Sequence, residues 1–69
     1  MAVLKVIEVL ASSKKSWEQA TQNGVKEAAK SLNKIRSVYV NEQSAKVTGD
    51  TVTEFRVNLK ISFEIDSKA

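Results

Sequence analysis

The stretch TVTEFRVNLKISFEI, residues 51–65, decides the fold of this chain of 69 residues. From Phe55 to Ile65 every odd position is apolar, and the positions between carry polar or charged side chains. A period of two predicts a strand with one buried and one polar face. Such a strand extends roughly 50 Å, whereas a compact domain of this length is only about 28 Å across. We therefore expect it to bend, to protrude or to be covered by other copies of the chain.

The segment before this strand, residues 36–47, reads as its antiparallel partner. Gly49 and Asp50 suit a two-residue type II′ hairpin loop, in which glycine takes the position with positive φ. That loop sets the register, because residues equally distant from it face each other.

The predicted register gives the hairpin an apolar and a polar face. The apolar face pairs Arg36 with Phe63, Val38 with Ile61, Val40 with Leu59, Glu42 with Val57 and Ser44 with Phe55. The polar face pairs Ser37 with Ser62, Tyr39 with Lys60, Asn41 with Asn58, Gln43 with Arg56 and Ala45 with Glu54. Glu42 is the exception, since it falls on the apolar face. A β-bulge that turns its side chain outward would explain it, and so would an ion or a subunit contact.

The first half of the chain predicts one strand and one helix. Residues 3–10 are rich in β-branched and apolar side chains on both faces, which favours a strand buried on both sides. Residues 11–15 read as a polar connector. Ser16 and Gln19 match a capping box, and an apolar stripe of about five turns then reaches Ile35.

This order, strand–helix–strand–strand, predicts a single α+β domain over residues 1–69. The crossover and the hairpin are both satisfied by a three-stranded antiparallel sheet with the long strand in the middle. We expect the helix to cover one face of that sheet.

Composition excludes several classes of protein. Cysteine and histidine are absent, which removes disulfides, thiolate metal sites and the commonest general base. A chain this short has a marginal core, so oligomerisation is the remaining route to stability. The net charge of +3 comes from scattered residues and fits a solvated surface. With no membrane-length apolar stretch and no signal-peptide layout, we expect a soluble, cytoplasmic protein.

No catalytic or nucleic-acid-binding constellation emerges from the residues. Serines have no histidine to activate them, and there is no phosphate-binding glycine loop. We therefore expect no enzymatic activity. Binding of single-stranded nucleic acid usually needs two or three exposed aromatic side chains, and only Tyr39 is expected on the open face of the sheet. No nucleic-acid or membrane partner is expected.

Four stretches of the sequence resemble the dodecin family. They are KVIEVLASS (5–13), SWEQA (16–20), IRSVYVNEQSAKV (35–47) and FRVNLKISFEI (55–65), so the resemblance covers essentially the whole chain. It implies a three-stranded antiparallel sheet partly wrapped around one helix, assembled into a hollow homo-oligomer, a dodecamer. It further implies binding of a small-molecule ligand, the flavins FMN or riboflavin, for storage or buffering rather than catalysis.

The resemblance also implies where the ligand would bind. A tryptophan that stacks on the flavin ring in flavin-binding dodecins corresponds to Ser37, and a glutamine that bonds the ring edge corresponds to Arg56. Loss of an aromatic stack should weaken flavin binding roughly tenfold to a hundredfold. Arg56 and Tyr39 could supply charge and partial aromatic contact instead.

The missing tryptophan resembles a branch of dodecins linked to calcium rather than flavin. Glu42, with Gln43, matches an acidic–amide pair near the ligand and ion pathway, and hard cations prefer such oxygen ligands. Three alternatives follow from the sequence: a flavin-binding cage with a weakened site, a calcium-binding cage without flavin, and an interaction module without a small ligand.

Overall fold

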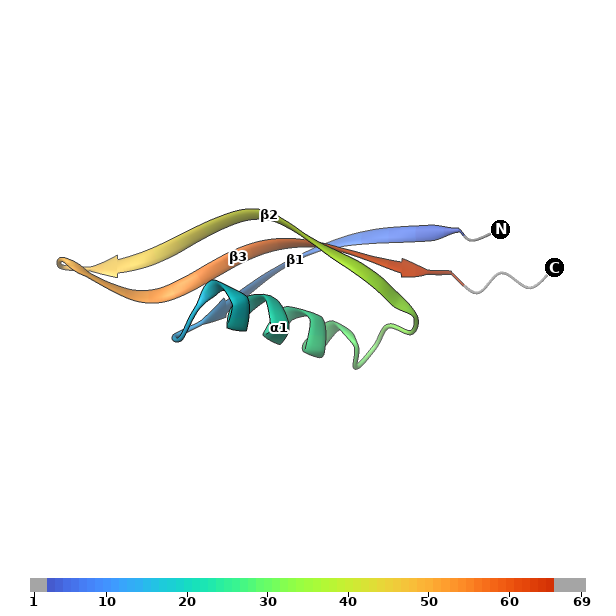
Figure 1. Cartoon of the computed structure of the whole chain (residues 1–69), viewed down its shortest axis with the longest axis horizontal. Coiled ribbons are helices and arrows are strands. Elements are labelled where there is room, and N and C mark those ends of the chain that lie inside the picture. Colours follow the sequence, from blue (N-terminus) through green and yellow to red (C-terminus); the bar gives the residue numbers. More distant parts are fainter. Residues whose placement is uncertain (1–2, 66–69) are drawn as a thin grey trace.

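The computed structural model describes residues 3–65, which form one sheet and one helix (Figure 1). The elements are β1 (Leu4–Ser13), α1 (Trp17–Ala28), β2 (Ile35–Thr48) and β3 (Thr51–Glu64). The sheet order is β1-β3-β2, and both neighbouring pairs are antiparallel. The predicted α+β fold, with the long strand in the middle and the helix on one face, is confirmed.

Helix α1 begins where the capping residues predict and ends sooner than the apolar stripe predicts. The Ser16 hydroxyl oxygen accepts a hydrogen bond from the Gln19 backbone N–H at 3.0 Å, as an N-cap residue does. The helix stops at Ala28, so the prediction of about five turns is wrong. Lys34 has φ 59 and turns the chain into β2, where Ile35 packs against the core as a strand residue.

Strand β1 is longer than predicted, and it is covered on one side only. It continues to Ser13, so most of the expected connector is strand. Ile7, Val9 and Ala11 pack against the core cluster under the helix. On its other side Leu10 is 80% exposed. The prediction of a strand buried on both sides is therefore wrong for one chain taken alone.

A small core lies between α1 and β3. Its fully buried members are Ala20, Val57, Leu59 and Ile61. The helix comes so close to the sheet at Gly24 that a Cβ atom there would lie 2.6 Å from Leu59 Cδ1. This close approach explains the small residues in the middle of the helical stripe.

The hairpin turn is as predicted. Thr48 pairs with Thr51, and Gly49 has φ 65. Asp50 is not among the positive-φ residues of the described chain, which fits a type II′ turn rather than type I′. The predicted register also holds at residues 37–40 of β2.

Between these two parts the register is shifted by one residue. Irregularities at Val40/Glu42 and at Lys46/Val47 leave Asn41 in β2 and Thr53 in β3 without a partner. Residues 42–46 of β2, which we call the shifted segment, are thereby paired one residue away from the predicted positions. A shift of one residue moves every side chain of a strand to the other face.

The shift corrects the two predicted pairs that matter for the site. Glu42 pairs with Asn58 and not with Val57, so the bulge turns its carboxylate away from the helix, as one of the two explanations predicted. Gln43 pairs with Val57 and not with Arg56, so it lies on the helix side of the sheet. The physical reason is that a charged carboxylate is costly beside the buried Val57.

The chain is elongated. Its extents are 56 × 19 × 13 Å and its radius of gyration is 14.3 Å, whereas a compact chain of this length would have about 11 Å. The β2–β3 hairpin projects well beyond the helix (Figure 1). The long strand therefore does protrude from its own domain. Within residues 3–65 no helix is long and apolar enough to cross a membrane.

Candidate ligand site on the open face of the sheet

The face of the sheet that points away from α1, here called the open face, combines charged, hydroxyl, amide and apolar side chains. Strand registers place these residues on it: Leu4, Val6, Glu8, Leu10 and Ser12 from β1; Ser37, Tyr39, Glu42, Ser44 and Lys46 from β2; Glu54, Arg56, Asn58, Lys60, Ser62 and Glu64 from β3. The bulges bring Glu42 and Ser44 to this face.

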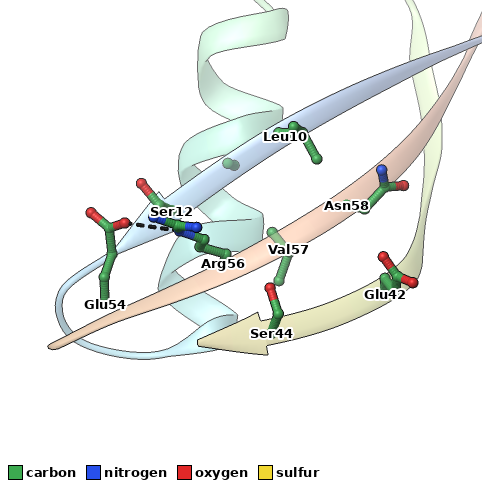
Figure 2. A pocket seen from close by; sticks show the side chains of 9 residues that line it. Leu10, Ser12, Glu42, Ser44, Glu54, Arg56, Val57 and Asn58 are labelled. Carbon is green, nitrogen blue, oxygen red and sulfur yellow. Dashed lines mark hydrogen bonds and ion pairs between the residues drawn. The ribbon is translucent and has the colours of Figure 1, made fainter. Parts of the chain in front are cut away.

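A hollow of about 370 Å³ lies on the open face where the three strands run side by side (Figure 2). It is lined by Leu10, Ala11, Ser12, Glu42, Ser44, Glu54, Arg56, Val57 and Asn58. Figure 2 shows that β1, β2 and β3 each contribute labelled side chains to it. The hollow is therefore built from all three strands, and the shifted segment forms one of its walls.

Opposite charges lie along the floor of the hollow. Arg56 Nε donates to Glu54 Oε1 at 3.1 Å, and about half of the Arg56 side chain is exposed. Because this ion pair is open to solvent, it contributes little to stability. The guanidinium can therefore exchange Glu54 for an anionic group of a ligand at small cost.

Asn58 carries the sharpest signal of a missing partner. Its Nδ2 atom donates to Glu8 Oε2 at 2.8 Å. Its Oδ1 atom is buried and has no hydrogen-bond partner. The residue of β2 that is paired with Asn58 is Glu42. An ionised carboxylate can only accept hydrogen bonds, so Glu42 cannot donate to Asn58 Oδ1. A cation or an external donor is the complement that this oxygen lacks, since buried polar atoms are nearly always paired.

The carboxylates of Glu8 and Glu42 come from the two outer strands. Glu42 is paired with Asn58 in the register, whereas Glu8 is paired with Lys60 and reaches Asn58 through the hydrogen bond from Nδ2. Together the three side chains offer only oxygen atoms to an ion, the ligand type that calcium prefers. No cluster of three or more His, Cys, Asp or Glu side chains that could hold a metal occurs within residues 3–65. The side chains of one chain could thus fill only part of the coordination shell of a cation.

Two of the candidate residues lie farther along the open face, outside the hollow. The Ser37 and Ser62 hydroxyls are hydrogen-bonded to each other across β2 and β3. Tyr39 faces Lys60 and is 65% exposed. A polar hydroxyl pair thus occupies the position for which the resemblance implied a stacking aromatic residue.

The structure brings together only some of the residues that the sequence indicated. Glu42 and Arg56 line one hollow, Ser37 and Tyr39 share its face, and Gln43 is on the other side. The sequence analysis did not select Asn58 or Glu8. The available signal was Glu8 itself, because it interrupts an otherwise apolar face of β1.

Known proteins resemble this chain over nearly its whole length. The Dodecin family model matches residues 3–66. A Mycobacterium tuberculosis protein named calcium dodecin is 37% identical over 65 residues, covering 94% of this chain and 92% of that protein. The crystal structure of M. tuberculosis calcium dodecin, described as calcium-chelating, aligns with a TM-score of 0.82 at 34% identity and covers 97% of this chain and 96% of that one. A dodecin structure from Streptomyces coelicolor aligns with a TM-score of 0.91 at 25% identity, covering 97% and 96%.

Proposed function

The chain belongs to the dodecin family, and from this premise we propose that it is a non-enzymatic, oligomeric binding protein that sequesters calcium on its open face. The observation that carries the proposal is the buried, unpartnered Asn58 Oδ1 between two carboxylate-bearing strands. The similarity to a protein named calcium dodecin supports the same ion.

The proposed site consists of Asn58 Oδ1 with the carboxylates of Glu42 and Glu8. Calcium takes six to eight oxygen ligands and accepts flexible geometry, so about half of the shell remains for water or another copy. Ion binding would satisfy Asn58 Oδ1 and neutralise two carboxylates on one small surface. The result would be a site tuned for storage or buffering, with no chemistry performed on the ion.

Several features of the single chain support assembly into the dodecamer that its family implies. Large apolar side chains remain exposed on the open face, among them Leu4, Val6 and Leu10. The extents of 56 × 19 × 13 Å leave the hairpin arm without cover from its own chain. Burial against neighbouring copies would remove this apolar surface from water, which is the usual driving force for association.

Calorimetric titration of calcium chloride into the purified, chelator-treated protein tests the calcium proposal. We expect saturable binding, and we expect Glu42→Gln to weaken it because the change removes a charge but keeps the shape. Glu18→Gln, on the exposed side of α1, is the matched control and should bind as the wild type does. Absence of heat with the wild type, or an equal effect of both variants, contradicts the proposed site.

A flavin is the second candidate ligand, and the half-exposed guanidinium of Arg56 in the hollow favours it. Arg56 could pair with the phosphate of FMN, while Tyr39 offers an exposed ring on the same face. This reading predicts tighter binding of FMN than of riboflavin, since riboflavin has no phosphate. Ser37 limits both affinities, because it offers no ring for stacking.

Quenching of flavin fluorescence separates the two candidates. FMN and riboflavin are titrated in parallel, first with the wild-type protein and then with the Arg56→Gln variant. If Arg56→Gln lowers the affinity for FMN to the affinity for riboflavin, the flavin reading is supported. If neither flavin is quenched by the wild type, the flavin reading is wrong. Ser37→Trp should then restore quenching if the surrounding surface still fits a flavin.

A further inference from the structure

Two basic side chains flank the proposed calcium site along β3. Alternate residues of a strand lie on one face, so Arg56, Asn58 and Lys60 follow one another on the open face, each about 7 Å from the next. The neighbouring strands supply the two carboxylates of the site, those of Glu8 and Glu42. A calcium ion at Asn58 Oδ1 would therefore lie between two like charges, and both would repel it.

The charges around the site do not balance once calcium is bound. The charged side chains of the open face on either side of Asn58 are three carboxylates and three basic groups: Glu8, Glu42, Glu54, Lys46, Arg56 and Lys60. This part of the surface is neutral as a whole before an ion binds. A calcium ion adds two positive charges that no side chain there offsets, so an anion that binds with it would restore the balance.

The hollow offers a place for such an anion beside the ion. Figure 2 shows the pair of Arg56 and Glu54 at one end of the hollow and Asn58 near the other end. The volume of about 370 Å³ corresponds to about a dozen water-sized groups, which exceeds the part of a calcium shell that the side chains leave open. Lys60 is not among the residues that line the hollow.

The guanidinium of Arg56 has donors to spare for an oxyanion. Its bond to Glu54 uses Nε, and within residues 3–65 neither of its Nη groups is hydrogen-bonded. A guanidinium binds carboxylate, sulfate and phosphate groups through two parallel N–H donors. The basic side chain at this end of the hollow is therefore suited to hold an anion, whereas Lys60 offers a point charge outside it.

We propose that the hollow binds calcium together with a small oxyanion, which the Nη groups of Arg56 hold and which supplies oxygen to the ion. This inference rests on the proposed function and fills part of the shell that one chain leaves open. One oxyanion, about 2.8 Å from the guanidinium and about 2.4 Å from the ion, spans the separation between Arg56 and Asn58. Calcium and the anion then raise each other's affinity, because such coupling is reciprocal.

Calcium binding in two buffers tests this coupling, with sulfate as the probe anion. The chelator-treated protein is titrated in chloride and in sulfate at equal ionic strength, and a calcium-selective electrode reads the free ion. The wild type should bind calcium about five- to tenfold more tightly in sulfate. Arg56→Gln should lose this gain, and in chloride it should bind calcium about threefold more tightly than the wild type, because a like charge is gone.

Lys60→Gln is the matched control, because it removes the same charge from the other side of Asn58, outside the hollow. It should also tighten calcium binding in chloride, yet it should keep the gain in sulfate. No gain in the wild type, an equal gain in Arg56→Gln, or loss of the gain in both variants overturns the anion subsite. Calcium binding without a sulfate effect leaves the proposed function intact, whereas no binding in either buffer contradicts both.

Discussion

The two faces of β3 differ in how far one chain completes them. On the helix side Val57 is 1% exposed, and Leu59 and Ile61 are fully buried. On the open face Arg56 and Lys60 are exposed, and Asn58 has a buried oxygen without a partner. The same strand thus takes part in a finished core on one side and an unfinished surface on the other. The finished side holds the fold, and the unfinished side is the surface on which the proposed ligand and neighbouring copies would bind.

Truncating the core should have the largest effect. Leu59→Ala removes a fully buried side chain and should lower the free energy of unfolding by about 3 kcal/mol. Lys60, the next residue of β3, lies on the open face and provides the control. Lys60→Ala should change the free energy of unfolding by less than about 0.5 kcal/mol. Denaturant unfolding at one fixed protein concentration measures both, because the proposed assembly would couple stability to concentration. Equal effects would remove the distinction between the faces.

A change on the unfinished side should act on assembly instead. Leu10 is 80% exposed in the single chain, so Leu10→Ser should leave the secondary structure intact. If neighbouring copies cover it, the change should weaken association by about 2 kcal/mol per copy. Light scattering across a dilution series measures this, with Gln22→Ala on the exposed side of α1 as the control. A dilution curve identical to that of the wild type would mean that Leu10 remains exposed to solvent in the assembly.

Filling the close approach between helix and sheet should have a smaller effect. Gly24→Ala places a Cβ atom 2.6 Å from Leu59 Cδ1 and 3.1 Å from Ala11 Cβ. Overpacking should cost about 2 kcal/mol, and the better helix propensity of alanine should return about 1 kcal/mol. We expect a net loss of about 1 kcal/mol in thermal or denaturant unfolding. Comparison of Lys26→Gly with Lys26→Ala, at an exposed helix position, isolates the propensity effect. A stabilised Gly24→Ala would show that Leu59 moves freely.

The smallest effect is expected outside both faces, at the turn into β2. Lys34 adopts φ 59, a left-handed conformation that costs an L-residue about 1 kcal/mol. Lys34→Gly should raise the free energy of unfolding by about 0.5 kcal/mol relative to Lys34→Ala, after the greater freedom of unfolded glycine is subtracted. Both variants lose the lysine side chain, so their difference reports the backbone alone. A difference of zero would contradict strain at this position.

The sequence was sufficient for the parts of the fold that depend on local rules. Alternation in β3, the Gly49–Asp50 turn and the Ser16 cap each indicated the element that forms. It was insufficient for the end of α1, because Leu32 and Ile35 continue the helical spacing although the helix ends at Ala28. The apolar character of a residue predicts that it is buried, but it does not predict whether that residue belongs to a helix or to a strand.

The site was predicted only in part, because side-chain facing depends on a register that is not local. Arg56 was assigned to the polar face, on which it lies. The predicted register put Glu42 on the apolar face, with a bulge as one explanation for it, and Gln43 was assigned to the wrong face. The shifted segment also receives a hydrogen bond from outside the hairpin, because the Trp17 indole donates to the Ser44 backbone oxygen across 27 residues of sequence. Pattern reading within a hairpin cannot detect such a contact.

Trp17 has one further consequence, for spectroscopy. It is the only tryptophan in the chain. Its indole N–H donates to the backbone oxygen of Ser44, a residue that lines the hollow. Indole emission responds to hydrogen bonding at that nitrogen, so the native protein carries its own optical probe next to the hollow. Changes in colour and intensity during a titration can therefore be read without attaching a dye.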